Sequence, residues 1–237
     1  MYNLQAIVRK NINCATTQFE RLGQVANNVA NYQTKAYKTT KFEQMLREDG
    51  YLTAVLRTDA RQGSLLITNN PYDVAISGHG YIPVISPEGE IQYTRDGSFM
   101  RGENGYLMTI DGWLVGDGIQ IPANSYKFTI SPNGDVHNYD NAGSEPQLIG
   151  RIPIVEFDSP ESLEIGHNNK VVPTDESGQP RLIAEHNSIR QHQVEQSNTN
   201  VFDEVNEMLR LNASMIASLN LMKVADDMYN KAINIRE

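Results

Sequence analysis

The chain has 237 residues, a length that suits one large domain or two small ones. Hydrophobic residues make up 39% of it and charged residues 21%, which is enough for a buried core. The net charge of −9 disfavours a role in binding nucleic acid, which needs a basic face.

The first predicted element is a helix over residues 3–31. Gly23 is its weak point, at a cost of about 1 kcal/mol relative to Ala. Three asparagines near its end (Asn27, Asn28 and Asn31) are poor in a helix interior, so they predict either a simple C-terminal cap or a packed, specific turn that binds a neighbouring loop. The apolar positions of this helix are spaced by three and four residues: Leu4, Val8, Ile12, Ala15, Phe19, Leu22, Ala26 and Val29.

The middle of the chain has strand patterns. Residues 41–56 are mixed and indicate a short helical turn or an extended linker, which Asp49-Gly50 ends. Residues 163–189 look loop-rich, and residues 191–197 lead into the final helix. Short β-rich segments lie at 64–68, 72–76, 81–85, 91–94, 106–109, 113–115, 126–130 and 149–157, the last with an edge-type Pro153. Tight turns are predicted at Glu88-Gly89, Asp96-Gly97, Asn104-Gly105, Asp111-Gly112, Asp117-Gly118 and Asn133-Gly134. This pattern favours a meander of antiparallel strands in a compact sandwich or partial barrel.

The last predicted element is one long helix over residues 200–235. Its apolar positions form a heptad seam, with Asn212 and Asp226 in the gaps: Val201, Val205, Met208, Met215, Leu219, Met222, Tyr229 and Ile233. An exposed apolar stripe on each terminal helix needs a partner. The simplest partners are the other helix and neighbouring copies of the chain.

The predicted fold is therefore mainly β, a compact antiparallel β domain inserted between N- and C-terminal helices of coiled-coil type. We expect residues 1–40 and 195–237 to form a terminal helical domain and residues 41–194 a β-rich outer domain. The residues expected at subunit interfaces are Leu4, Val8, Ile12, Phe19, Leu22, Val29, Val201, Val205, Met208, Met215, Leu219, Met222 and Ile233.

The sequence offers no catalytic, cofactor-binding or metal-binding pattern. Its five histidines are scattered and form no zinc motif. There is no nucleophile elbow and no phosphate-binding glycine loop. Asp96, Asp111 and Asp117 each precede a glycine and are interpreted as turn residues. We therefore expect a protein that is not an enzyme and needs no cofactor.

Cellular context is only partly constrained by the sequence. The single cysteine, Cys14, cannot form an intramolecular disulfide and is expected to be a small apolar residue on a helix. No apolar run approaches the roughly 18 residues of a membrane span. The first fourteen residues lack the apolar core of a cleavable secretory signal. We therefore expect a protein that is cytosolic or exported by a route that needs no such signal.

Three stretches of the chain resemble the flagellar axial proteins of bacteria, the rod and hook subunits. The first is Ala26-Asn27-Asn28-Val29-Ala30-Asn31, similar to the signature that closes the family's N-terminal helix. The second runs from Asn70 to Tyr81 and continues in residues 93–99 and 105–107. The third is Glu195-Gln196-Ser197-Asn198-Thr199-Asn200-Val201, with Glu204-Val205 and Met208-Leu209, similar to the opening of the family's C-terminal helix.

The resemblance implies a structural polymer without enzymatic activity. Family members pack their terminal helices as an inner tube with the β domain outside it. They cross the inner membrane through the flagellar type III export apparatus, so no cleavable signal is expected. The implied location is the rod of the basal body in the periplasmic space, and the implied partners are copies of the chain and other rod and hook subunits.

Two departures from the family pattern bear on the subunit type. Ala36 stands where the family usually has Gly, and an Ala at positive φ costs about 1 kcal/mol. The segment between Phe42 and Gly63 is shorter than expected for the distal rod subunit, which keeps the proximal-rod type open beside a slightly favoured distal type. A hook subunit would need a further domain, and the smallest rod subunits lack the β domain. The alternative from another class is a β-rich glycan-binding or glycan-processing module that dimerises through its helices.

Overall fold

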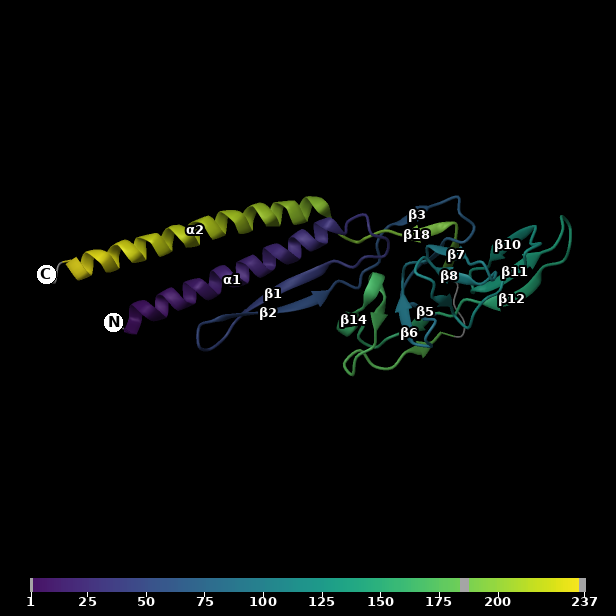
Figure 1. Ribbon diagram of the computed structural model, residues 1–237, viewed down its shortest axis with the longest axis horizontal. Coiled ribbons are helices and arrows are strands. Elements are labelled where there is room, and N and C mark those ends of the chain that lie inside the picture. The colour runs from purple at the N-terminus through teal and green to yellow at the C-terminus, as the bar shows by residue number, and fades with distance from the viewer. Residues whose placement is uncertain (1, 184–187, 235–237) are drawn as a thin grey trace. The chain divides into compact units, whose positions relative to one another are not determined.

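The computed structural model describes residues 2–183 and 188–234 and shows two compact units. The first unit comprises residues 1–32, 39–59 and 199–237, and the second comprises residues 33–38 and 60–198. The fold class is confirmed, because the described chain is mainly antiparallel β with one long α-helix near each end (Figure 1).

The first unit contains two antiparallel helices and a β-hairpin. Helix α1 (Tyr2–Ala30) and helix α2 (Val201–Asn234) agree with the predicted ranges within about one residue. Asn200 caps α2, since its side-chain oxygen accepts the backbone N–H of Phe202 at 3.1 Å. Asp203 and Glu204 in the first turn complement the positive end of the helix dipole.

The hairpin corrects the interpretation of residues 41–56 as a helical turn or linker. Strand β1 (Thr40–Leu46) pairs with strand β2 (Leu52–Thr58) from Thr40↔Thr58 to Leu46↔Leu52. Gly50, at φ 77°, lies in the turn between them. The sequence did not show the regular alternation of a strand here. One face of the hairpin is charged, with ion pairs Arg57–Glu43 and Lys41–Asp59, while apolar side chains stand on both faces near the turn.

This hairpin belongs to the unit that contains the helices, whereas the expected boundaries put it in a β-rich domain of residues 41–194. Its strands pack along α1, where Asn13 and Asn28 hydrogen-bond to it. That this unit forms an inner layer and the other an outer layer stays a prediction.

The second unit is built from antiparallel pairings only, among the described residues. A seven-stranded sheet has the order β14-β15-β6-β5-β9-β8-β7 and a three-stranded sheet the order β10-β11-β12. Two-stranded pairings are β13-β16, β17-β4 and β18-β3. The bounds are β3 (Leu65–Ile67), β4 (Val74–Ile76), β5 (Ile82–Ile85), β6 (Ile91–Thr94), β7 (Phe99–Arg101), β8 (Leu107–Thr109), β9 (Leu114–Val115), β10 (Lys127–Ile130), β11 (Asp135–Tyr139), β12 (Gln147–Arg151), β13 (Val155–Glu156), β14 (Glu164–Ile165), β15 (Val171–Val172), β16 (Arg181–Leu182), β17 (Ile189–Gln191) and β18 (Gln193–Glu195), with 3-10 turns at Pro160–Ser162 and His167–Asn169.

Two hydrophobic clusters hold this unit together. The larger one joins the two sheets and buries side chains from β4, β5, β7, β8, β10 and β11; it contains Val74, Ile76, Ile82, Phe99, Leu107, Val115, Ile119, Ile121, Phe128, Ile130, Val136, Ile152, Ile154 and Ile189. The smaller one is aromatic, with Phe157 in edge contact with Tyr81 and Tyr93. Burial of these side chains is the main source of the unit's stability.

The predicted turns and strands need three corrections. Gly97 does not have positive φ and closes no hairpin, because β6 and β7 are not neighbours in the sheet. Glycine is needed there because a Cβ would lie 1.6 Å from the carbonyl oxygen of Val74. The segment 149–157 is split at Pro153 into the end of β12 and β13, and β17 and β18 replace the expected lead into the final helix.

Ala36 adopts the left-handed conformation that the family pattern assigns to glycine. Ala36 has a φ of 55° and is buried. Its N–H donates to the carbonyl oxygen of Glu195 at 2.9 Å. The turn is therefore formed despite a backbone cost of about 1 kcal/mol.

A buried ion pair joins Lys170, beside β15, to Asp111 in the turn between β8 and β9. The ammonium group of Lys170 also lies 4.6 Å from the centre of the Trp113 ring. Burial raises the pKa of the Asp111 carboxyl, but hydrogen bonds from Lys170, Thr109 and Asn168 and the charge of Lys170 outweigh it and bring the pKa to about 2. Asp111 is thus the turn residue that the sequence predicted and also the counter-ion of a buried lysine.

This pair predicts a specific pH dependence. Because the folded-state pKa of Asp111 lies below the unfolded value of about 3.9, its contribution to stability is present above pH 4 and is lost as the pH falls toward 2. Asp111→Asn should lower the free energy of unfolding by about 3 kcal/mol at pH 7, because it leaves Lys170 buried without a counter-ion. Urea titrations between pH 7 and pH 2 should show this difference shrinking below pH 4.

Asp117→Asn is the matched control, since Asp117 also precedes a glycine but is exposed. It should change the free energy of unfolding by less than about 0.5 kcal/mol. A difference between wild type and Asp111→Asn that stays constant down to pH 2 would contradict the assigned pKa.

Candidate assembly surfaces

The two terminal helices pack in register along each other. Asn28 donates from Nδ2 to Glu204 Oε1 at 3.2 Å, and Gln18 donates from Nε2 to Ser214 Oγ at 2.9 Å. Ten residues separate the two contacts on each helix, so the helices run antiparallel without slippage. An ion pair between Arg21 and Glu207, at 2.5 Å, lies between these contacts.

One stripe of α2 therefore faces α1. Its members are buried or half-buried and repeat by three and four residues: Glu204, Met208, Leu211, Met215, Ser218, Met222 and Ala225. Burial raises the pKa of Glu204, and the charges of Glu207 and Asp203 add to this effect, while the hydrogen bond from Asn28 opposes it. Three methionines of the predicted seam, Met208, Met215 and Met222, thus pack within the chain's own helix pair.

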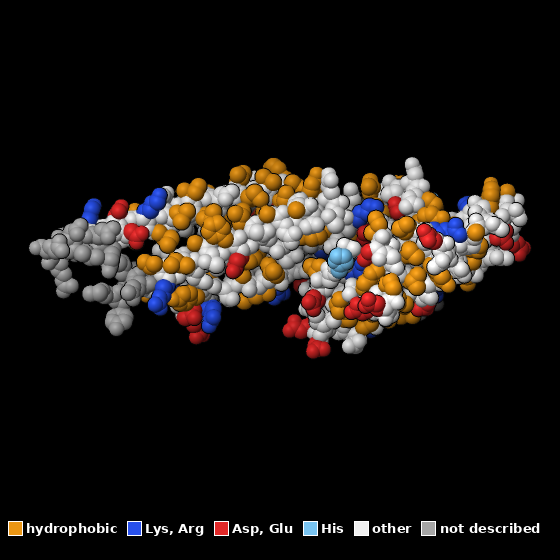
Figure 2. Space-filling view, in the orientation of Figure 1, with side chains coloured by type: hydrophobic (Ala, Val, Ile, Leu, Met, Phe, Trp, Pro, Cys, Tyr) orange, Lys and Arg blue, Asp and Glu red, His pale blue; other side chains and the backbone are white. Residues whose placement is uncertain are grey.

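A second stripe of α2 is exposed and apolar. It consists of Phe202, Val205, Leu209, Ile216 and Leu219, with Asn212 in the gap of the same heptad spacing. Phe202 is 74% exposed and Leu209 62%. Figure 2 shows apolar side chains gathered on the surface formed by the terminal helices. Apolar side chains arranged in a continuous stripe indicate an interaction surface, whereas single ones do not.

Helix α1 carries a comparable outward stripe. Ile12 and Phe19 are about half exposed, and Gly23, Ala26 and Ala30 continue the spacing toward the end of the helix. A Cβ on Gly23 would meet no atom within 4 Å, so the glycine opens this face to solvent. The side chains of this stripe are therefore large toward the start of the helix and small toward its end.

The structure separates the predicted interface residues into two groups. Ile12, Phe19, Val205 and Leu219 are exposed, as an intersubunit role requires. A second group is half-buried: Val8, Leu22, Val29, Val201, Met208, Met215 and Met222. The side chains of Leu4 and Ile233 lie outside the described residues. The predicted seam does not include Phe202, Leu209 and Ile216, which are also exposed, because α2 is apolar around most of its circumference and several seams fit it.

Two asparagines of α1 fix the hairpin to the helix. Hydrogen bonds within the hairpin join odd-numbered residues, such as Arg47 with Tyr51, so the N–H and C=O groups of Thr40 and Leu52 point outward from opposite edges. The Asn28 amide donates to Thr40 O at 3.0 Å and accepts Thr40 N–H at 3.1 Å. Asn13 makes the same pair of bonds with Leu52, at 3.2 and 2.7 Å.

The spacing of these two asparagines matches the hairpin. The fifteen residue steps from Asn13 to Asn28 along the helix span about 22 Å. The six steps along β1 from Thr40 to Leu46, which lies opposite Leu52, span about 20 Å. Asn28 is almost fully buried, so the helix end is a packed, specific turn rather than a simple cap. Helix α1 thus crosses the hairpin from one edge to the other.

Within the described residues no group of three or more His, Cys, Asp or Glu side chains could hold a metal ion. In the same part of the chain no helix combines the length and apolarity needed to cross a membrane. The described residues combine two packed terminal helices that carry apolar outer stripes with a β unit inserted between them in the sequence.

Comparison with known proteins identifies which structural protein it resembles. Residues 75–138, from within β4 to within β11, match the family model of the flagellar hook protein FlgE/F/G D1 domain. The chain is 32% identical over 179 residues to the flagellar basal-body rod protein FlgG of Caulobacter vibrioides, with 74% of this chain and 68% of the relative covered. It is 30% identical over 235 residues to FlgG of Buchnera aphidicola subsp. Acyrthosiphon pisum, covering 87% and 90%. The flagellar basal-body rod protein FlgF of Mesorhizobium japonicum is 30% identical over 225 residues, with 90% of each chain covered.

The chain therefore belongs to the family of flagellar basal-body rod proteins. This confirms the resemblance drawn from residues 26–31, 70–107 and 195–209. It also agrees with the expectation of a structural protein that is not an enzyme.

The asparagine pairs give a test of how the first unit is held together. Asn28→Ala should raise the hydrogen-exchange rate of the Thr40 amide about 100-fold, because it leaves buried backbone groups unsatisfied at a cost of about 3 kcal/mol. Asn13→Ala should have the corresponding effect at Leu52. Exchange measured by NMR or mass spectrometry on the purified chain would show both.

Asn27→Ala is the control, since Asn27 is exposed on the same helix and its side-chain oxygen accepts a hydrogen bond from the Asn31 amide. It should leave exchange at Thr40 within about threefold of wild type. Equal effects of Asn27→Ala and Asn28→Ala would mean that helix propensity, not the amide pair, holds the hairpin.

Proposed function

We propose that this chain self-assembles through its terminal helices into the axial rod of the flagellar basal body, where it acts as part of the drive shaft for motility. The observation that carries the proposal is the exposed apolar stripe of α2, from Phe202 to Leu219, on a helix whose other face is already covered by α1. A helix pair that is satisfied on its inner side can present its outer side to neighbouring copies.

The partners proposed are copies of the same chain and other rod and hook subunits. Family membership supports this, since the relatives carry the name of basal-body rod proteins. We further propose that the chain is exported without a cleavable signal through the flagellar type III apparatus and that its rod lies in the periplasmic space. The described residues offer no feature that favours the glycan-module alternative.

The proposed position is the distal rod, with the proximal rod as the alternative. Relatives named FlgG match this chain at 32% and 30% identity and a relative named FlgF at 30%, a difference too small to choose between the two positions, so a complementation experiment is needed. Strains that lack either the distal or the proximal subunit should be transformed with this chain. Recovery of swimming in the distal-subunit strain alone supports the distal assignment, and recovery in the other strain alone overturns it.

Leu219→Asp tests the assembly surface. Leu219 is 46% exposed in the single chain, so the aspartate can stay hydrated in the monomer. In an assembled rod the same charge would be buried without a partner at each subunit contact, at a cost of several kcal/mol. We expect a soluble, folded monomer that forms no rods, seen as loss of swimming and absence of hooks on purified basal bodies.

Asn220→Asp is the matched control, because it adds the same charge at a neighbouring exposed position without removing an apolar group. It should assemble normally. Met215→Asp, on the stripe that faces α1, should instead destabilise the monomer itself. Normal hooks with Leu219→Asp would show that the outer stripe of α2 is not an intersubunit surface.

A further inference from the structure

The chain passes between its two units at four points, after residues 32, 38, 59 and 198. Three segments of the second unit carry these crossings: residues 33–38, residues 60–63 and residues 195–198. We call them the exit segments. All three meet at one buried carboxylate, that of Glu195 at the end of β18.

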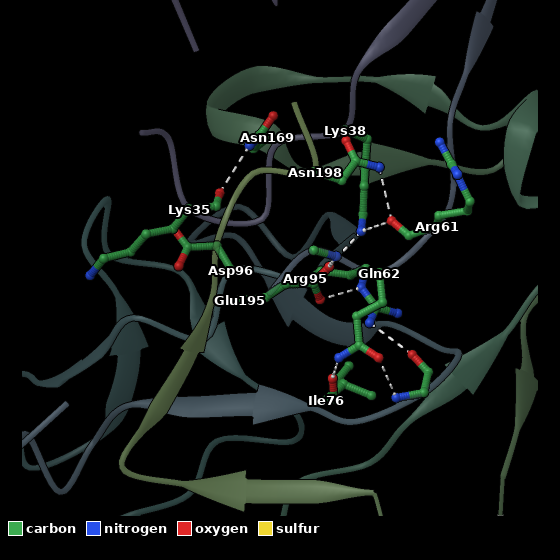
Figure 3. A network of polar contacts seen from close by, with 12 residues as sticks. Lys35, Lys38, Arg61, Gln62, Ile76, Arg95, Asp96, Asn169, Glu195 and Asn198 are labelled. Carbon is green, nitrogen blue, oxygen red and sulfur yellow. Dashed lines mark hydrogen bonds and ion pairs between the residues drawn. The ribbon is translucent and has the colours of Figure 1, made fainter. Parts of the chain in front are cut away.

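The Glu195 side chain is fully buried and accepts hydrogen bonds on both oxygens (Figure 3). Its Oε1 accepts the Lys38 ammonium at 2.5 Å and the Gly63 N–H at 2.9 Å. Its Oε2 accepts Arg95 Nε at 2.8 Å. One carboxylate therefore contacts the other two exit segments and the body of the β unit.

The two cations are anchored in turn. Arg95 donates from its terminal nitrogens to the carbonyl oxygens of Gly80, at 2.6 Å, and Gly78, at 2.8 Å, so it joins Glu195 to the turn that follows β4. Lys38 donates to the carbonyl oxygen of Arg61 at 2.8 Å, which ties the first exit segment to the second. A buried charge held by this many bonds has little freedom to relax.

Further bonds link the exit segments in pairs. Ala36 N–H donates to the Glu195 carbonyl at 2.9 Å, and Asn198 N–H donates to the Tyr37 carbonyl at 3.3 Å. The Asn198 amide donates to Arg61 O at 2.9 Å. The Gln62 amide donates to Ile76 O at 2.7 Å and accepts Gly78 N–H at 2.9 Å, which docks the second segment on the β unit.

The network borders the smaller hydrophobic cluster only through Arg95, whose guanidinium carbon lies 5.8 Å from the centre of the Tyr81 ring. We therefore expect the exit segments to open at a lower free energy than the core strands, as a local event. The sequence separations, 157 residues between Lys38 and Glu195 and 100 between Arg95 and Glu195, show that it closes only in the folded unit.

We propose that the Glu195 carboxylate is an ion lock that holds the three exit segments at one point of the β unit, so that load passed along the chain is carried by all four crossings together. The proposal rests on the proposed rod function for its load-carrying role. The lock itself is a property of the single chain and is tested without assembly.

Hydrogen exchange tests the lock. Glu195→Gln keeps the shape of the side chain but removes the charge that holds Lys38 and Arg95. We expect exchange at the amides of Ala36, Gly63 and Asn198 to rise by about 100-fold, well beyond any change in the β5–β6 ladder. Val136→Ala, a cavity in the core, is the matched control and should affect both sets of amides through global unfolding alone.

If Glu195→Gln raises the exchange rate by the same factor at the exit segments and in the β5–β6 ladder, the proposal of an ion lock is wrong. If Glu195→Gln does not fold, the lock is tested with Lys38→Met instead, because this variant keeps the Arg95–Glu195 pair. It should speed exchange at Ala36 and Asn198 while leaving the ladder unchanged, and no increase at those amides would reject the proposal.

Swimming under load tests the second half of the proposal. In a strain whose rods depend on this chain, Glu195→Gln should give hooks in normal number but a speed that falls more than wild type when the medium is made viscous. If the ratio of the variant's swimming speed to that of wild type is the same in ordinary and viscous medium, the load-carrying role is rejected. Failure of the wild-type chain to restore rods would reject the proposed function and leave the exchange result intact.

Discussion

The first unit depends on one buried amide. Asn28 Nδ2 donates to Thr40 O and to Glu204 Oε1, while its oxygen accepts Thr40 N–H and the Gln24 amide. A primary amide has two donor hydrogens and two acceptor positions, and here each has a partner. The helix pair and the hairpin meet at this side chain. No apolar residue could substitute for it, because the edge of the hairpin would keep its backbone groups without partners.

The terminal helices therefore differ between the side that faces the other helix and the side that faces outward. Toward each other they use polar contacts at defined positions together with Leu211 and Val25, which are buried. Polar contacts fix register, because a slipped helix would break the hydrogen bonds from Asn28 to Glu204 and from Gln18 to Ser214. The outward sides are apolar and carry no such contacts among the described residues. Register within the chain is thus set by contacts of the single chain, and the outward apolar surface is not used for it.

Local patterns could predict the helices and most strands, but not what joins them. Both helices followed from apolar spacing, and turn glycines located the hairpins at Gly89, Gly105, Gly112 and Gly134. The β1–β2 hairpin was not predicted, because apolar side chains stand on both of its faces near the turn and because Asn13 and Asn28, which bind it to α1, lie on another element. Half of the predicted seam of α2 proved to face α1, since heptad spacing gives the period of a stripe but not its partner. The Glu195 network was not predictable, because its members are distant in sequence and each looks like an ordinary surface charge.

Both units thus use a buried polar side chain to hold together segments that are distant in the sequence. A chain that leaves one unit and returns to it must hold distant segments together where no large apolar core is available. Asn28 does this for the helix pair and hairpin, and Glu195 does it for the exit segments. Apolar packing alone would tolerate sliding, whereas a buried polar group with all its partners allows one arrangement. This accounts for the many asparagines in the stretches that carry the family resemblance, and for the presence there of Arg95, Glu195 and Glu204. Their polar side chains hold distant segments of the chain together, while the exposed apolar stripes of α1 and α2 take no part in these contacts.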